Sequence, residues 1–172
     1  MRRVTVGPVL IAVSLLAACD EPKSPAEQAS EDARAVAMVE AAQNVKPPPV
    51  PIEPQPITAV DIEENKIYGS GCTLVPATIP GGDPLVMANG NRALVKLSGK
   101  FVTFAADPGS PELGLGARTH YVGKAQSLRL ARSPGDGTAL GQDGQRWDGR
   151  AEIRDAADQL IWSAAGVVTC GG

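Results

Sequence analysis

The sequence predicts a mainly β fold, a small antiparallel sandwich or barrel with one disulfide, preceded by a helical and proline-rich tether. Three observations lead to this prediction. From residue 71 onward, short runs of alternating polar and apolar residues are separated by turns rich in glycine and proline, which is typical of antiparallel strands. Two cysteines stand near the two ends of this region. An acidic segment of helical composition and then a run of prolines precede it.

The N-terminal segment has the plan of a secretory signal peptide. Arg2 and Arg3 precede an uncharged run from residue 4 to residue 18 that ends in two small residues, as the basic, apolar and cleavage regions of such signals require. A membrane-spanning helix needs about 20 apolar residues, whereas this run has 15 and is soon followed by Asp20. We therefore expect residues 1–18 to be removed on export.

The end of this segment, Leu16-Ala17-Ala18-Cys19, resembles the lipobox of bacterial lipoproteins, an aliphatic residue and two small residues before a cysteine. The resemblance implies a diacylglycerol on the Cys19 thiol, cleavage before Cys19 and an N-acyl chain such as palmitate on the new N-terminus. The expected location is the periplasm-facing side of the cell envelope, with Asp20 favouring the inner membrane over the outer one. The alternative for Cys19 is a buried small hydrophobic residue.

The segment 19–56 is expected to be a tether. Residues 20–65 carry ten acidic and three basic side chains, whereas residues 66–172 carry nine acidic and eleven basic ones. Ser24-Pro25-Ala26-Glu27 predicts a capping box that begins a helix to about Gln43. This helix is either a frayed tether or an interaction helix. The prolines of 46–56 favour polyproline II, as a spacer or as a ligand for a proline-binding groove.

The β-domain is expected to span 57–172. Thr58 predicts the cap of a short helix through Glu64. Strands are then expected over 71–75, over a three-stranded meander at 85–105 with a hairpin at Asn89-Gly90, over 125–131, and over a final pair from Trp147 to Cys170. The segments 107–116 and 133–145 are expected to be loops because they are rich in glycine and proline.

Cys72 and Cys170 are the two cysteines that remain after Cys19. Disulfides persist in the oxidising compartments that exported proteins meet. A Cys72–Cys170 bridge joining the first strand to the last is therefore expected, with two unpaired thiols as the alternative.

Most catalytic and metal-binding patterns are missing from the sequence. His120 is the only histidine, HExxH and Gly-x-Ser-x-Gly are absent, and no zinc-ligand spacing of cysteines occurs. Asp136 and Asp143 lack the spacing of a calcium loop and are expected to be solvated loop residues. We therefore expect a non-enzymatic protein with no metal and no cofactor besides its covalent lipid. A hydrolase that uses His120 is the less favoured alternative.

Arg118, His120 and Tyr121 form a candidate interaction surface, because they lie together between a loop and a strand, where binding residues often occur. The preceding residues Gly116-Ala117-Arg118 faintly resemble the Ser-Gly-Ala-Arg-Tyr run of membrane-bound C-type lysozyme inhibitors. Leu115 replaces the serine, and Tyr121 falls two positions late. The resemblance implies a small disulfide-linked β-barrel with a loop that plugs the lysozyme cleft.

The whole domain resembles a group of small proteobacterial lipoproteins without an assigned function, through Gly71-Cys72, Phe104-Ala105-Ala106-Asp107, Gly116-Ala117-Arg118 and Thr169-Cys170-Gly171. Basic residues are not clustered as in nucleic-acid binders. The sequence thus predicts a membrane-anchored envelope lipoprotein with a binding or structural β-domain. The expected partners are the membrane, through the lipid anchor, and an envelope protein.

Overall fold

The computed structural model describes residues 23–79 and 81–172, so the expected signal peptide, the lipobox, Cys19 and Asp20 lie outside the described residues. The chain divides into two compact units, one that ends at Lys46 and one that spans Pro47–Gly172. The second unit therefore begins earlier than Ile57, the expected start of the β-domain.

The described part of the first unit is the helix α1 (Pro25–Gln43), which begins at the predicted capping box. Ser24 Oγ accepts a hydrogen bond from Glu27 N at 3.3 Å, and Glu27 Oε2 accepts one from Ser24 N at 2.9 Å. No residue of α1 is buried. Neither helix in the described part of the chain is long and apolar enough to cross a membrane.

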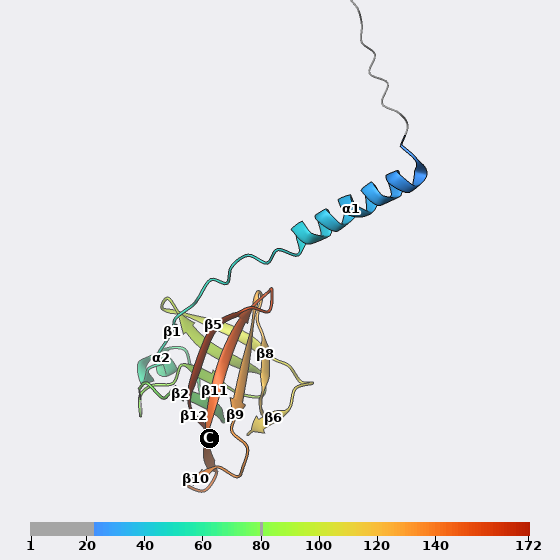
Figure 1. Ribbon diagram of the computed structural model, residues 1–172. Helices are drawn as coiled ribbons and strands as arrows, with labels where there is room; N and C mark the ends of the chain where they lie inside the picture. Colours follow the sequence, from blue (N-terminus) through green and yellow to red (C-terminus); the bar gives the residue numbers. More distant parts are fainter. Residues whose placement is uncertain (1–22, 80) are drawn as a thin grey trace, which may run out of the picture. The chain divides into compact units, whose positions relative to one another are not determined.

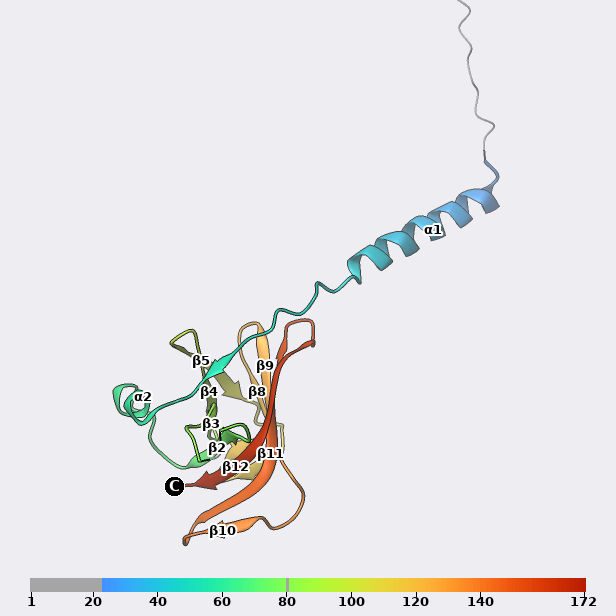
Figure 2. The same ribbon diagram turned by 60° about the vertical axis from the view of Figure 1, so that its left-hand side comes forward.

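The second unit is a closed antiparallel barrel of eight strands, which confirms the mainly β prediction and selects a barrel over a sandwich (Figures 1 and 2). Each strand pairs with the next around the ring, and the last pairs with the first. In ring order the strands are β2 (Gly71–Pro76), β3 (Val86–Ala88), β4 (Arg92–Leu97), β5 (Lys100–Ala106), β8 (His120–Val122), β9 (Gln126–Arg132), β11 (Gly144–Asp155) and β12 (Leu160–Gly171).

The barrel interior is filled by alternate side chains of these strands. Successive residues of a strand point to opposite faces, so every second residue enters the core. In β9, for example, Leu128 and Leu130 are fully buried, whereas Arg129 between them is exposed. The largest fully buried side chains of the core are Leu74, Val86, Val95, Phe104, Tyr121, Leu128, Leu130, Ile153 and Val168.

One wall of the barrel is completed by the end of the proline-rich segment. β12 pairs with β2 only from Gly166 onward, which leaves the first half of β12 without that neighbour. There Ile52 N donates to Ile161 O at 3.2 Å, and the short strand β1 (Pro54–Gln55) pairs with the end of β4. Ile52 also packs against the core. This part of the expected spacer is therefore a piece of the barrel wall.

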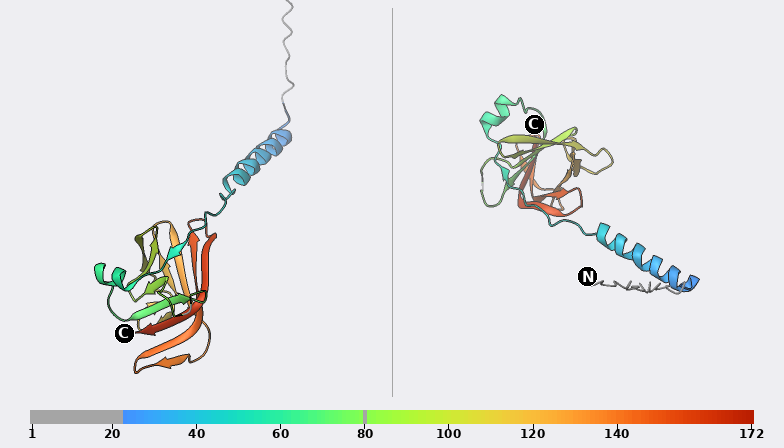
Figure 3. Two further views of the ribbon diagram at one scale, coloured as in Figure 1. Left: turned by 90° about the vertical axis from the view of Figure 1, so that its left-hand side faces the viewer. Right: turned by 90° about the horizontal axis from the view of Figure 1, so that it is seen from above.

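The helix α2 (Ala59–Glu64) lies on the outside of the barrel, as the left panel of Figure 3 shows. Thr58 caps it as predicted, with Asp61 in place of the usual glutamate. Lys96 Nζ on β4 donates to Asp61 Oδ1 at 2.7 Å. Leu94 points outward by strand alternation and is nevertheless buried, because α2 and the loop after it cover this side.

The Asp61–Lys96 pair predicts a loss of stability in acid. The Lys96 ammonium, and then the Thr58 N–H, lower the pKa of Asp61 from 3.8 to about 2. A carboxyl whose pKa is lower in the folded state stabilises that state above its unfolded pKa and ceases to do so as pH falls through the folded value. We expect the free energy of unfolding to decrease between about pH 4 and pH 2, as measured by urea titration. Asp61→Asn should remove this part of the pH dependence of the unfolding free energy. A pH profile of Asp61→Asn equal to that of the native chain would contradict the assignment to Asp61.

The predicted disulfide is present between Cys72 and Cys170, whose Cα atoms lie 4.0 Å apart. The two residues stand directly opposite each other in the β2–β12 pairing. The bridge thus joins the first and last strands of the ring, as expected from the sequence.

Candidate functional site

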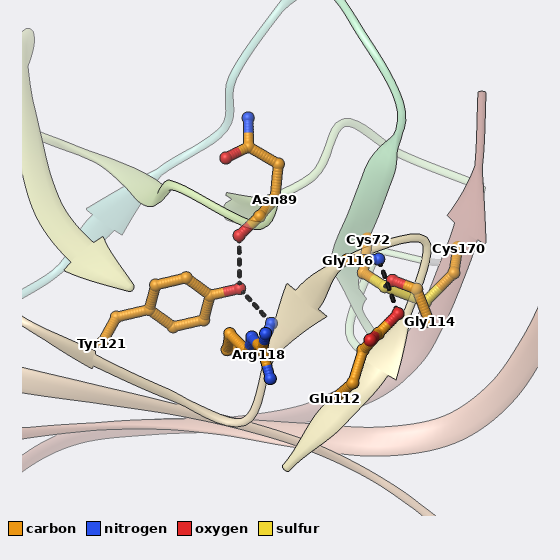
Figure 4. The surroundings of a disulfide bond; sticks show 8 residues. All are labelled: Cys72, Asn89, Glu112, Gly114, Gly116, Arg118, Tyr121 and Cys170. Atoms are coloured by element: carbon orange, nitrogen blue, oxygen red, sulfur yellow. Dashed lines mark hydrogen bonds between the residues drawn. A yellow bond between two sulfur atoms is a disulfide. The ribbon is translucent and has the colours of Figure 1, made fainter. Parts of the chain in front are cut away.

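The end of the barrel next to the disulfide is covered by a small hairpin whose first strand and turn lie in the predicted loop 107–116 and whose second strand follows it. It consists of β6 (Glu112–Gly114) and β7 (Ala117–Arg118). Leu113 and Ala117 are buried in the barrel core. A Cβ added to Gly114 would lie 3.5 Å from the Cys170 sulfur, so β6 packs directly on the disulfide (Figure 4). The strands are too short for an alternating pattern to reveal them.

Tyr121 holds this hairpin in place from inside the barrel. Its hydroxyl accepts a hydrogen bond from Arg118 N at 2.7 Å and donates one to Asn89 O at 3.0 Å (Figure 4). The side chain is fully buried, and this burial raises the pKa of its phenol. Tyr121 thus connects the β6–β7 hairpin with the β3–β4 turn and contributes no accessible surface.

Tyr121→Phe is expected to lower the free energy of unfolding by about 1–2 kcal/mol, because it leaves the partly buried N–H of Arg118 and carbonyl of Asn89 without their partner. Chemical denaturation measures the change. Tyr68→Phe, on an exposed tyrosine, is the matched control and should have no effect. Equal stability of Tyr121→Phe and the native chain would contradict this role.

Arg118 and His120, the other two predicted residues, are partly exposed and both contact the turn 107–110. Arg118 Nη1 donates to Ser110 O at 3.2 Å. His120 Nδ1 lies 3.2 Å from Asp107 Oδ2. This contact with His120, and then the Gly109 N–H, lower the pKa of Asp107. Because Tyr121 is buried, it does not share the partly exposed surface on which Arg118 and His120 lie.

The His120–Asp107 pair has two of the three groups of a Ser–His–Asp site. Such a site also needs a hydroxyl or thiol hydrogen-bonded to the other imidazole nitrogen. Among the described residues, the contact with Asp107 is the one hydrogen bond of the His120 side chain. The pair ties the end of β5 to β8, since Asp107 N also donates to His120 O at 3.0 Å.

The turn of the β6–β7 hairpin exposes Leu115. Leu115 and Gly116 have φ values of 48° and 79°, the left-handed conformation of a tight hairpin turn. Asparagine or glycine is favoured there, and a leucine costs roughly 1–2 kcal/mol. Glu112 Oε1 accepts from Gly116 N at 2.8 Å, which helps to hold the turn. An apolar side chain is thus exposed at 43% of its surface in an unfavourable backbone conformation.

A second surface element beside this turn is the glycine-rich loop between β9 and β11. Arg132 lies over the indole of Trp147, with its guanidinium carbon 4.4 Å from the ring centre. Arg132 Nη1 and Trp147 Nε1 both donate to Gly135 O at 3.1 Å, which folds the loop around the pair. The strand β10 (Thr138–Leu140) lies within this loop and pairs with β11. Neither Arg132 nor Trp147 was predicted as a site residue, although both flank the glycine-rich run.

The hairpin and the loop enclose two adjoining clefts, which we call the rim clefts. One, of about 280 Å³, lies between Leu115 and the β10–β11 turn, and Trp147 lines it. The other, of about 430 Å³, lies between Glu112 and Asp136. Leu113 and Arg132 line both. The two clefts therefore lie where the hairpin faces the Arg132–Trp147 pair.

No group of three or more histidine, cysteine, aspartate or glutamate side chains suited to a metal ion occurs in residues 23–79 and 81–172. Comparisons of the chain with protein-family models, with curated proteins and with solved structures find no match.

Proposed function

We propose that this protein is a lipid-anchored cell-envelope lipoprotein whose barrel binds an envelope protein and catalyses no reaction. The motif Leu16-Ala17-Ala18-Cys19 supports the anchor, and Cys19 is the residue that would carry the diacylglycerol and the N-acyl chain. A disulfide-closed domain suits the oxidising side of a membrane. Asp20 favours the inner membrane.

The observation that carries the binding role is Leu115 at the edge of the rim clefts. Residues held in unfavourable backbone conformations occur preferentially where function requires them. The turn is fixed by the disulfide beneath β6 and by the Tyr121 hydroxyl beside β7, so it is a rigid support for an exposed apolar contact. Such preorganised contacts suit recognition of a protein surface.

Anchoring is tested by metabolic labelling with radioactive palmitate. The native protein is expected to take up label and to remain with membranes after a high-salt wash. Cys19→Ser should abolish both, whereas Cys72→Ser is the matched control that keeps the lipidated cysteine. Labelling that survives Cys19→Ser would refute the anchor.

Binding at the rim is tested by site-specific photo-cross-linking in intact cells. Leu115 and Gln142 line opposite sides of the smaller rim cleft. A cross-linking side chain at either position is expected to capture the same envelope protein. The control position is Lys100, the exposed first residue of β5. Capture of the same protein with equal yield from all three positions, or from none, would contradict a partner at the rim.

Leu115→Asn is expected to separate binding from folding. Asparagine tolerates the left-handed turn, so the free energy of unfolding should rise by about 0.5–1 kcal/mol. Partner capture through Gln142 should nevertheless fall at least tenfold, because the exposed apolar contact is lost. Urea denaturation and cross-link yield are the two measurements, and a stabilised variant with full capture would remove Leu115 from the binding surface.

A lysozyme-inhibitor-like activity is the second candidate function. The residues that carry that resemblance, Gly116-Ala117-Arg118, lie in and beside the exposed hairpin turn. The purified protein would then slow lysis of a bacterial cell-wall suspension by lysozyme, and Arg118→Ala would weaken the effect. Circular dichroism must show Arg118→Ala to be folded. An unaffected lysis rate with the native protein would eliminate this candidate.

A further inference from the structure

A separate groove lies on the outside of the barrel, between the β2–β3–β4 wall and the loop 65–70 that follows α2. Its volume is about 80 Å³. Met87 and Leu94, from β3 and β4, and Ile67 from the loop supply apolar lining. Tyr68 stands at the groove with 67% of its surface exposed. The loop thus forms one side of a small groove that is partly apolar.

Arg92 is the one charged residue that lines this groove, and no carboxylate lines it. In the described part of the chain, its guanidinium has no ion pair and no hydrogen bond. Arg150 and Arg154 on the barrel wall both lie close to Glu152, whereas Arg129 resembles Arg92 in having no ion pair among the described residues but does not line this groove. Arg92 therefore presents an unneutralised positive charge beside apolar side chains.

Neighbouring hydrogen-bonding groups are held in place around Arg92. Asn89 Oδ1 accepts from the backbone N–H groups of Asn91 and Arg92, at 2.9 Å each, which fixes the Asn89 side chain and leaves its amide Nδ2 available. The Asn89 carbonyl is itself held by the buried Tyr121 hydroxyl. The hydroxyl-bearing residues Ser70 and Thr73 also line the groove. The turn that positions Arg92 is thus rigid before any ligand arrives.

We infer that this groove binds an organic carboxylate that carries a small aliphatic group. A guanidinium matches a carboxylate in charge and planar geometry, and the amide and hydroxyl groups add neutral donors. Met87, Leu94 and Ile67 would contact the aliphatic part, which distinguishes this ligand from an inorganic anion. The small volume limits it to a short acid or to the C-terminus of a peptide that ends in a small apolar residue. This site is independent of the lipid anchor and of the rim clefts.

The inference is tested by NMR titration of the ¹⁵N-labelled chain from residue 19 onward, with Cys19→Ser to keep it free of lipid. The probes are propionate, acetyl-alanyl-alanine, the C-terminal amide of that dipeptide, and inorganic phosphate. Propionate represents a free acid and the dipeptide a peptide terminus. We expect one or both carboxylates to shift the amide signals of Gly69, Gly71 and Thr73, and the amide-capped dipeptide and phosphate to bind at least tenfold more weakly.

Arg92→Gln is expected to lower carboxylate affinity at least tenfold. Arg129→Gln is the matched control, because Arg129 is an exposed arginine on β9 that also lacks an ion pair among the described residues. It should bind as the native chain does. The inference is overturned if neither carboxylate shifts these signals, if phosphate or the amide binds equally well, or if Arg92→Gln binds like the control. Unchanged signals elsewhere in the Arg92→Gln spectrum show that it is folded.

Discussion

Replacing Cys72 and Cys170 together by serine is expected to lower the free energy of unfolding by about 4–5 kcal/mol. The bridge closes a loop over a sequence separation of 98 residues, and the chain-entropy model assigns roughly this value to loops of that length. It also joins the two strands at which the ring of the barrel closes. Because small domains are stable by only about 5–15 kcal/mol, the variant should be close to its folding limit at 37 °C.

Guanidinium denaturation of the native chain with and without reductant provides the measurement. The reduced native chain should match the double serine variant, since both lack the bridge. Cys19→Ser is the control that removes a cysteine without touching the bridge. A difference below about 1 kcal/mol between the oxidised and reduced chains would show that the disulfide does not govern the stability of the barrel.

A chain that begins at Ile57 is expected to be less stable than one that begins at Pro47, by about 2–4 kcal/mol. The shorter chain lacks Ile52, which packs against the core and donates to Ile161 O of β12, and it lacks β1, which pairs with the end of β4. The value combines the burial of one aliphatic side chain with several backbone hydrogen bonds. Gln55 Oε1 also accepts from Gly99 N at 2.6 Å, so the β4–β5 turn loses a contact.

Urea denaturation of three chains measures this effect. The control is a chain that begins at Lys23, which contains α1 as well. Because no residue of α1 is buried, this chain should have the same stability as the one that begins at Pro47. If the chain from Ile57 were as stable as both, the segment 47–56 would be a spacer and no part of the barrel wall. Ile52→Ala in the chain from Pro47 should reproduce part of the loss.

The sequence predicted the elements whose causes are local. The capping residues Ser24 and Thr58 begin the two helices where the structure has them. A hairpin occurs near Asn89-Gly90, as predicted. Its turn is centred one residue later, on Gly90 and Asn91, because Asn89 N donates to Arg92 O. The Asn89 side chain holds this turn by accepting from the backbone N–H groups of Asn91 and Arg92. The disulfide followed from the two cysteines that remain besides Cys19, on the expectation that the chain is exported.

The short elements β6, β8 and β10 were not predicted, because strands of three residues show too little alternation to be recognised. The role of Tyr121 was not visible either. Its neighbours Arg118 and His120 suggested a polar surface, but strand β8 alternates and turns Tyr121 into the core. The candidate surface therefore had to be described anew, around Leu115, Arg132 and Trp147.

The sequence by itself determined the class of fold, the caps and the pair of bridging cysteines, since each depends on neighbouring residues or on composition. Only the tertiary structure decided that the sheet closes into a barrel, that residues 52–55 complete its wall and that Arg132 meets Trp147. Alternation shows which side chains share a face of a strand, but not which strand lies beside it. That choice depends on backbone hydrogen bonds and packing between residues far apart in the chain.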